Sequence, residues 1–340
     1  MAIRLARKPD KKDLRILYEL DLNARISVSE LARRVGLSPQ VTDYRVRALF
    51  NDGTIIGSMA LLDTPRLGYF IFRIYMRLQN ITQKKEARIV NYLKNHPLSV
   101  WVVSASGRWD IEALFTCRNP VHFSNVIKEI KADLGSHILD FNLSASVVNY
   151  HFTRSYLAEI ERALSKYLFV GFEPELQHLD EKDIRILEIL SKDARKSNVD
   201  IGKAVGLTYN GVKNRIRRLE GNGIIAGYRI FMDLSKIGRR YYKSLITLHN
   251  INEIIGKRMY EFCVNDPRIT YLVEIMGEWD IELEAEVKNE EEFREIMLNF
   301  RSQFGQYIRD YEVLHVYKEH KMNYFPMAKE MLKQIKSSRN

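Results

Sequence analysis

Residues 31–39 read Leu-Ala-Arg-Arg-Val-Gly-Leu-Ser-Pro, and residues 201–209 read Ile-Gly-Lys-Ala-Val-Gly-Leu-Thr-Tyr. Gly36 is suited to end one helix, because glycine adopts the left-handed conformation of a helix cap at little cost. Ser38 is a natural N-cap for a following helix, and Pro39 stands at the first helical position, where a missing N–H is tolerated. The stretch predicts two short helices joined by a tight turn, which is the pattern of a helix-turn-helix.

The residues on either side of this stretch extend the helical pattern. An upstream helix is predicted from Lys11 to about Asn23, with Leu14, Leu17 and Leu20 on one face. The helix that begins at Pro39 places three residues on its inner side and breaks at Asn51-Asp52-Gly53; these residues are Thr42, Val46 and Leu49. We therefore expect a three-helix DNA-binding domain over residues 10–57.

The chain repeats itself at an offset of 170 residues without a gap. The run Trp109-Asp110-Ile111-Glu112, for example, returns as Trp279-Asp280-Ile281-Glu282. This period is much longer than the about 20–50 residues of a solenoid repeat. Each copy is large enough to be domain-sized, so the sequence predicts a fused pseudo-dimer with two-fold pseudo-symmetry.

After each helix-turn-helix the hydrophobic period changes from helical to alternating. Strands are expected at Ile55–Leu62, Phe70–Leu78, Val100–Ser106, Ile111–Cys117 and Ile138–Tyr150, with helices at Gln83–Asn95 and Val121–Leu134. The order βαββαβ is that of a ferredoxin-like sandwich, so the fold class is α+β in tandem. The predicted domains are helix-turn-helix domains at 10–57 and 180–227 and α+β domains at 66–150 and 236–320. A linker at 151–178 is expected to contain an amphipathic helix over Phe152–Leu168.

Composition narrows the class of partner. The net charge is +10, of which residues 1–170 carry +9 (25 basic against 16 acidic) and residues 171–340 carry +1 (28 against 27). A basic chain favours nucleic acid or another polyanion as partner.

The two cysteines, Cys117 and Cys263, do not fall on the repeat, which favours idle reduced thiols over a disulfide framework. No apolar stretch is long enough to span a bilayer, and we expect a cytoplasmic protein.

The third helix of each head carries polar residues on the side away from its apolar stripe, where a recognition helix presents donors to DNA bases and phosphates. The candidate DNA-binding residues are Ser38, Gln40, Tyr44, Arg45 and Arg47 in the first copy and Thr208, Tyr209, Asn210, Lys213, Asn214, Arg215, Arg217 and Arg218 in the second. Asp43 faces phosphate repulsion in the first copy, so the two heads are expected to be non-equivalent. The alternative is that these helices are scaffolding with a solvated charged face.

These residues resemble the Lrp/AsnC (feast/famine) family of transcription regulators. The resemblance rests on residues 31–39, 45–49, 201–219 and 227–233 and on the repeated Gly-x-x-Asp turn, and it covers nearly all of both copies. It implies double-stranded DNA as partner, an amino-acid effector near the turn, and self-association through the α+β domains. The implied effector residues are Gly107, Asp110, Gly277 and Asp280. The alternative for the turn is a tight β-turn with its tryptophan packed between sheets.

The family ordinarily has one copy per chain, so the fusion leaves open whether the α+β domains pair within or between chains. Two other functions stay open: an architectural DNA-bridging protein, and an enzyme like the siroheme decarboxylases, which place a similar domain behind a helix-turn-helix. The latter needs His and Arg in a pocket, yet none of the eight histidines is matched at the 170 offset. No catalytic cluster, phosphate loop, metal-ligand spacing or cofactor motif is found, so we expect a non-enzyme.

Overall fold

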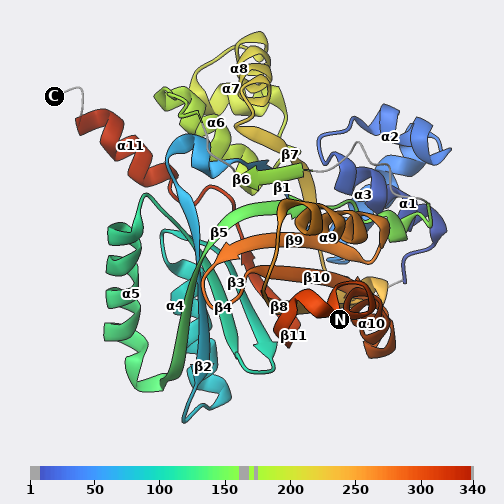
Figure 1. The fold of residues 1–340 in the computed structure, drawn as a ribbon. Coiled ribbons are helices and arrows are strands. Elements are labelled where there is room, and N and C mark those ends of the chain that lie inside the picture. Colours follow the sequence, from blue (N-terminus) through green and yellow to red (C-terminus); the bar gives the residue numbers. More distant parts are fainter. Residues whose placement is uncertain (1–7, 161–167, 172–174, 338–340) are drawn as a thin grey trace.

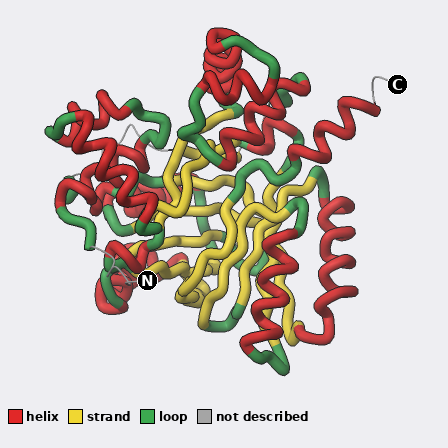
Figure 2. Tube along the Cα trace, turned by 180° about the vertical axis from the view of Figure 1, so that it is seen from behind, coloured by secondary structure: helices red, strands yellow, loops and turns green. Residues whose placement is uncertain are grey.

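The computed structural model of the chain describes residues 8–160, 168–171 and 175–337. Two helical heads stand on a body of β-strands with helices on its outer side (Figures 1 and 2). The first head consists of α1 (Lys11–Leu22), α2 (Val28–Val35) and α3 (Pro39–Asn51). The second head consists of α6 (Glu181–Lys192), α7 (Asn198–Val205) and α8 (Tyr209–Gly221).

The two helix-turn-helix turns form as the sequence predicts. Gly36 and Gly206 cap α2 and α7 with φ angles of 64° and 65°, in the left-handed region that favours glycine. The Ser38 hydroxyl accepts a hydrogen bond from the Val41 amide at the start of α3, and Thr208 plays the same part in α8. The inner faces are buried at Thr42, Val46 and Leu49 in α3 and at Val212, Ile216 and Leu219 in α8.

Each copy continues into an antiparallel sheet with two helices. The first α+β domain consists of β2 (Phe70–Leu78), α4 (Gln83–Asn95), β3 (Ser99–Ser106), β4 (Ile111–Cys117), α5 (Pro120–Leu134) and β5 (Ile138–His151). The second consists of β8 (Arg240–Leu248), α9 (Glu253–Asn265), β9 (Ile269–Met276), β10 (Ile281–Val287), α10 (Glu290–Phe304) and β11 (Ile308–Met322). The sheet orders β5-β2-β4-β3 and β11-β8-β10-β9 confirm the ferredoxin-like prediction.

The two sheets are joined edge to edge within the one chain. β3 pairs with β11 and β5 pairs with β9, both antiparallel. Because β2 also pairs with β5, the eight strands close into a ring, which we call the barrel. Its interior holds an aromatic cluster in which Trp109 and Trp279 lie 6.2 Å apart at 87°. The packing of these tryptophans between the two sheets agrees with the alternative interpretation of the Gly-x-x-Asp turn.

A two-stranded ribbon connects the heads to the barrel. It consists of β1 (Ile55–Leu62) and β7 (Ile225–Met232), which pair antiparallel with Met59 opposite Arg229. Each strand follows its own head and passes along the other head. The Ala24 amide donates to the Tyr228 carbonyl, and the Ala194 amide donates to the Ser58 carbonyl. The ribbon therefore fixes both heads with one shared element.

The linker differs from its prediction. Among its described residues, Ser155–Leu157 form a 3-10 turn and β6 (Leu168–Gly171) pairs with β5, in place of the expected amphipathic helix. Residues 161–167 of that expected helix lie outside the described residues. Gly171 has a φ of 133°, and a Cβ there would lie 2.3 Å from the Val147 carbonyl oxygen, so a glycine allows β6 to pair this closely.

A C-terminal helix, α11 (Ala328–Ser337), adds a contact that the sequence did not suggest. Phe325 and Met327 just before it are buried, and the helix packs against α6 of the second head. In the described ranges no helix has both the length and the apolar character needed to cross a membrane.

Candidate DNA-binding heads and the cavity beneath them

The second recognition helix, α8, presents most of its predicted contact residues to solvent. Tyr209 is 51% exposed. Thr208, Asn210, Asn214, Arg217 and Arg218 are also exposed, and Lys213 is half-buried. Within the described part of the chain, Lys213 and Arg217 form no salt bridge, so their charges are available to a phosphate backbone.

The arginines at the equivalent positions 45 and 215 have internal partners. The Arg45 guanidinium donates to Asp10 at 2.8 Å and to Asp13 at 2.7 Å, which joins α3 to the capped start of α1. Arg215 makes the same two contacts, with Asp180 and Asp183. Both arginines therefore hold their recognition helix on the head, and their assignment as DNA contacts stays a prediction.

The other predicted DNA-contacting arginines, Arg47 on α3 and Arg218 on α8, also have carboxylate partners. Arg47 is paired with Asp43 at 2.8 Å, one turn away on α3. Arg218 is paired with Asp183 at 2.5 Å but remains exposed. Gln40 is exposed and Tyr44 is 69% exposed, so α3 offers neutral groups with little unpaired charge.

The two heads hold each other through a reciprocal pair of arginines. Arg25 donates to the Ala194 carbonyl at 2.5 Å and to the Lys196 carbonyl at 3.1 Å. Its repeat partner Arg195 donates to the Ala24 carbonyl at 2.7 Å and to the Ile26 carbonyl at 3.4 Å. Together with the ribbon, these contacts fix the separation of the two recognition helices, which a two-headed DNA-binding protein needs.

The four predicted effector residues lie in turns at the rim of the barrel. The Asp110 carboxylate accepts the Leu78 amide at 2.7 Å, and the Asp280 carboxylate accepts the Leu248 amide at 2.6 Å. A Cβ on Gly107 would lie 2.6 Å from the Val313 carbonyl oxygen, and one on Gly277 would lie 2.7 Å from Ser144. Each turn is thereby packed against the opposite copy.

The structure brings these two turns together, since Arg108 forms a salt bridge with Glu278 at 2.8 Å. Asp280 also lines an open groove with Tyr150, His249 and Glu274. The effector assignment of Gly107, Asp110, Gly277 and Asp280 stays a prediction.

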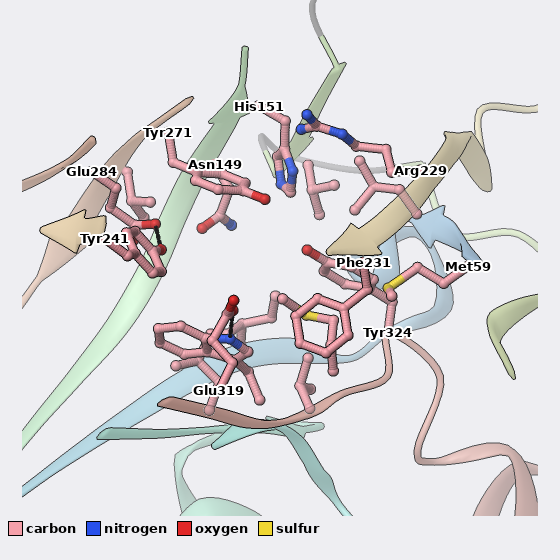
Figure 3. A pocket seen from close by; sticks show the side chains of 18 of the residues that line it. Met59, Asn149, His151, Arg229, Phe231, Tyr241, Tyr271, Glu284, Glu319 and Tyr324 are labelled. Carbon is pink, nitrogen blue, oxygen red and sulfur yellow. Dashed lines mark hydrogen bonds between the residues drawn. The ribbon is translucent and has the colours of Figure 1, made fainter. Parts of the chain in front are cut away.

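A cavity lies between the ribbon and the end of the barrel (Figure 3). Every barrel strand and both ribbon strands contribute to its wall. The space open to the centre of a water molecule is about 70 Å³. Its aromatic lining residues are Trp101, Phe231, Tyr241, Tyr271 and Tyr324, and its polar ones are Arg73, Asn149, His151, Arg154, Arg229, Glu284, Glu286 and Glu319.

An ion network at the edge of the cavity joins the first head, the ribbon and the barrel. Asp21 on α1 accepts from Arg154 and from Arg229 on β7, each at 2.6 Å. Arg154 also pairs with Glu286 on β10 at 2.8 Å. Burial opposes ionisation of Asp21, but the two guanidinium groups beside it hold its pKa below the ordinary value.

A second ion cluster lies deeper in the barrel. The fully buried Lys243 ammonium group contacts Glu112 at 2.8 Å, Glu282 at 3.0 Å and Glu284 at 3.1 Å. Its repeat partner Arg73 pairs with Glu282 at 2.7 Å. Burial disfavours charge on Lys243, but the surrounding carboxylates outweigh that effect and raise its pKa.

Three groups of the cavity wall have unused bonding capacity among the described residues. The buried His151 Nδ1 and Arg229 Nη1 atoms have no hydrogen-bond partner. The Glu319 carboxyl accepts from the Trp101 indole at 2.8 Å and forms no salt bridge with any residue that the structure describes. Burial raises the pKa of Glu319 to about 7. Burial, together with the positive charges of Arg229 and Arg154, lowers the pKa of His151 well below its usual range. A buried polar group without a hydrogen-bond partner destabilises the folded state, and a bound ligand that supplies the partner would remove this cost. The cavity is therefore a candidate ligand site.

This cavity is not evident from the matched residues of the two copies, because its lining residues differ between them. The cavity spans the pseudo-two-fold axis, so each copy contributes different residues to it. Arg229 corresponds to Met59, Glu284 to Leu114 and Glu286 to Thr116. A usable signal was present: several charged positions of one copy have uncharged counterparts in the other, and these positions gather around one cavity.

Comparison with known proteins places these heads in a class. A family model described as "AsnC-type helix-turn-helix domain" matches residues 179–220, and one described as "Winged helix-turn-helix DNA-binding" matches residues 9–56. An uncharacterized HTH-type transcriptional regulator of Pyrococcus abyssi is 31% identical over 145 residues, covering 42% of this chain and 95% of the relative. One of Pyrococcus horikoshii is 28% identical over 150 residues, with the same coverage. The second head is thus similar to an AsnC-type helix-turn-helix domain, and the first to a winged helix-turn-helix DNA-binding domain.

The chain belongs to the Lrp/AsnC family of helix-turn-helix transcription regulators. It is also similar over its whole length to a solved structure, the siroheme decarboxylase NirDL. The TM-score is 0.59 at 12% identity, covering 96% of this chain and 100% of NirDL. The complex of NirDL with an iron-uroporphyrin III analogue gives 0.60 at 13% identity, covering 97% and 100%. At this identity the similarity concerns the tandem fold.

Proposed function

We propose that this protein regulates transcription by binding double-stranded DNA with two unequal heads held in fixed separation within one chain. The observation that supports the proposal most directly is the pair of capped, outward-facing recognition helices, joined by the ribbon and by Arg25 and Arg195. A dimeric helix-turn-helix protein needs this arrangement to contact two half-sites. Here one chain provides both heads.

The second head is proposed as the stronger one. Lys213 and Arg217 carry charge on α8 without a salt-bridge partner among the described residues, whereas Arg45 and Arg47 on α3 are paired with carboxylates. Pairing lowers the gain from a phosphate contact, because an existing ion pair must be broken to make it. The first head therefore contributes mainly through neutral groups such as Gln40 and Tyr44.

A salt-series titration tests this ranking. We expect the double variant K213Q/R217Q to bind DNA more weakly than R45Q/R47Q and to reduce the slope of log affinity against log salt by about 2, since each phosphate contact contributes roughly 0.9 to that slope. Thermal unfolding of both variants is the control for folding, because Arg45 also holds α3. Equal affinity losses with equal slopes would contradict the unequal heads. Affinities that do not depend on DNA sequence would instead support an architectural role.

The family resemblance also suggests modulation by an amino acid at the Gly-x-x-Asp turns, and the groove beside Asp280 offers space for one. The same titration in the presence of individual amino acids tests this, with the Asp280→Asn variant as control. An affinity change that persists in Asp280→Asn would place the effector elsewhere.

A second candidate function is tetrapyrrole chemistry of the NirDL kind. It is favoured by the full-length similarity in fold and by a cavity that contains His151 and three arginines. The cavity as it stands is too narrow for a macrocycle, since the space open to water centres is about 70 Å³. We therefore expect no shift of the absorption band of iron-uroporphyrin III when it is titrated with the protein. A saturable shift that His151→Ala abolishes would favour the enzyme over the regulator.

A further inference from the structure

The cavity beneath the ribbon is separate from the DNA-facing helices and from the Gly-x-x-Asp turns, none of which contributes to its wall. It is small, since the space open to the centre of a water molecule is only about 70 Å³. Figure 3 shows the Tyr271 and Tyr324 hydroxyls, the His151 ring and the Glu319 carboxyl directed toward its centre. A ligand that fits must be compact and polar.

Acidic groups outnumber basic ones around the cavity and in the ion clusters beside it. The acids are Asp21, Glu112, Glu282, Glu284, Glu286 and Glu319, and the bases are Arg73, Arg154, Arg229 and Lys243. The bases form salt bridges with five of these acids, so Glu319 is the acid without a cation among the described residues. Beside Glu319 an anionic ligand would meet a carboxylate that has no cation partner among the described residues, whereas a cationic ligand would provide one.

The wall chemistry favours a cation for a second, independent reason. Trp101, Tyr241, Tyr271, Tyr324 and Phe231 surround the space. Aromatic faces attract ammonium groups, most strongly where water is excluded. The walls already accommodate internal cations in this way, since the Lys243 ammonium lies 5.0 Å from the Trp101 ring centre and the Arg229 guanidinium 5.9 Å from that of Tyr271.

On the side of the cavity opposite Glu319, the groups without a hydrogen-bond partner are nitrogen atoms and not a carboxylate. Arg229 Nη1 is a donor without an acceptor, and His151 Nδ1 also lacks a partner among the described residues. A hydroxyl or carbonyl oxygen on the ligand satisfies the arginine without adding negative charge. Arg229 lies on β7, so a ligand that bonds to it contacts the ribbon that connects the heads.

We propose that the cavity binds a small primary amine that carries an uncharged oxygen, with Glu319 as the counter-ion of the ammonium group and Arg229 as the donor to the oxygen. Resting on the proposed function, this ligand acts as an effector, because it bridges the barrel to the ribbon and thereby sets the position of both heads. This site is distinct from the Gly-x-x-Asp turns in place and in ligand charge.

Calorimetric titration of the full chain with three matched probes tests the proposal. Ethanolamine carries the amine and the oxygen, propionate carries only negative charge, and β-alanine carries both charges. We expect ethanolamine to bind, propionate not to bind, and Glu319→Gln to weaken ethanolamine at least tenfold. Glu291→Gln, at an exposed position on α10, is the matched control for the loss of one carboxylate and is expected to bind normally.

The outcomes separate this site from the proposed DNA function. Phe231→Trp fills the cavity from the ribbon while it retains Glu319, and it is expected to abolish ethanolamine binding independently of any change at Glu319. Preferential binding of propionate or β-alanine would overturn the amine assignment, and no binding of any probe would overturn the site. DNA affinity is measured separately on the same samples, so a protein that binds DNA but no amine refutes only the ligand site.

Discussion

Replacing Glu319 by glutamine should change the pH dependence of stability in a defined way. The carboxyl has a pKa of about 7 in the folded protein instead of its ordinary 4.5, because burial and the neighbouring Glu286 and Glu284 oppose its ionisation, while Trp101 and Arg154 partly offset them. The folded state therefore keeps the carboxyl protonated up to about pH 7 and carries the carboxylate above that pH. The folded protein loses stability as the pH rises from 4.5, the pKa of this carboxyl in the unfolded chain, to about 7, its pKa in the folded protein. Above pH 7 the lost stability is not regained.

A shift of 2.5 pH units corresponds to about 3 kcal/mol at roughly 1.4 kcal/mol per unit, and the partial accessibility of the side chain reduces the expected effect to about 2 kcal/mol. Glutamine removes this loss and can still accept from the Trp101 indole. We expect Glu319→Gln to match the parent protein in urea unfolding at pH 4.5 and to exceed it by about 2 kcal/mol at pH 8. A stability difference that stays the same at both pH values would refute the argument.

The remaining predictions concern the contacts that hold the heads. Asp21→Asn leaves Arg154 and Arg229 short of a counter-charge, and we expect about 3–5 kcal/mol of destabilisation in urea unfolding. Ser191→Ala, at the matched position of the second copy, should cost less than about 1.5 kcal/mol; similar losses in both would contradict the importance of the ion network. The double variant Arg25→Ala/Arg195→Ala removes the reciprocal contacts, and spin labels on α3 and α8 should report a broader distance distribution with the fold retained. An unchanged distribution would mean that the ribbon alone fixes the heads.

The local parts of the fold were predictable because local chemistry determines them. Glycine caps at Gly36 and Gly206 and hydroxyl N-caps at Ser38 and Thr208 set the turns of both heads. Alternation of apolar residues set the strands. The prediction of a helix in the linker was wrong because the apolar spacing of the linker fits either a helix or a strand. The pairing of Leu168–Gly171 with β5 is a tertiary contact that the local pattern does not encode.

Long-range features were not predictable from one copy. The closure of the barrel depends on pairing between strands far apart in sequence, such as β3 with β11. The predicted DNA contacts Arg45 and Arg215 have carboxylate partners on the first helix of each head, a contact that helix periodicity cannot show. The cavity was missed because its residues diverge between the copies, and comparing the repeats for differences reveals positions such as His151 that a search for identities passes over.

The most direct test of the central claim is a titration of the purified chain against the DNA immediately upstream of its own gene and against a scrambled duplex, over a salt series. The account predicts tighter binding to the upstream DNA, one chain per site, with a steep negative dependence of log affinity on log salt. Absence of binding to either duplex at low salt would contradict it and would leave the two heads as scaffolding for the barrel and its cavity.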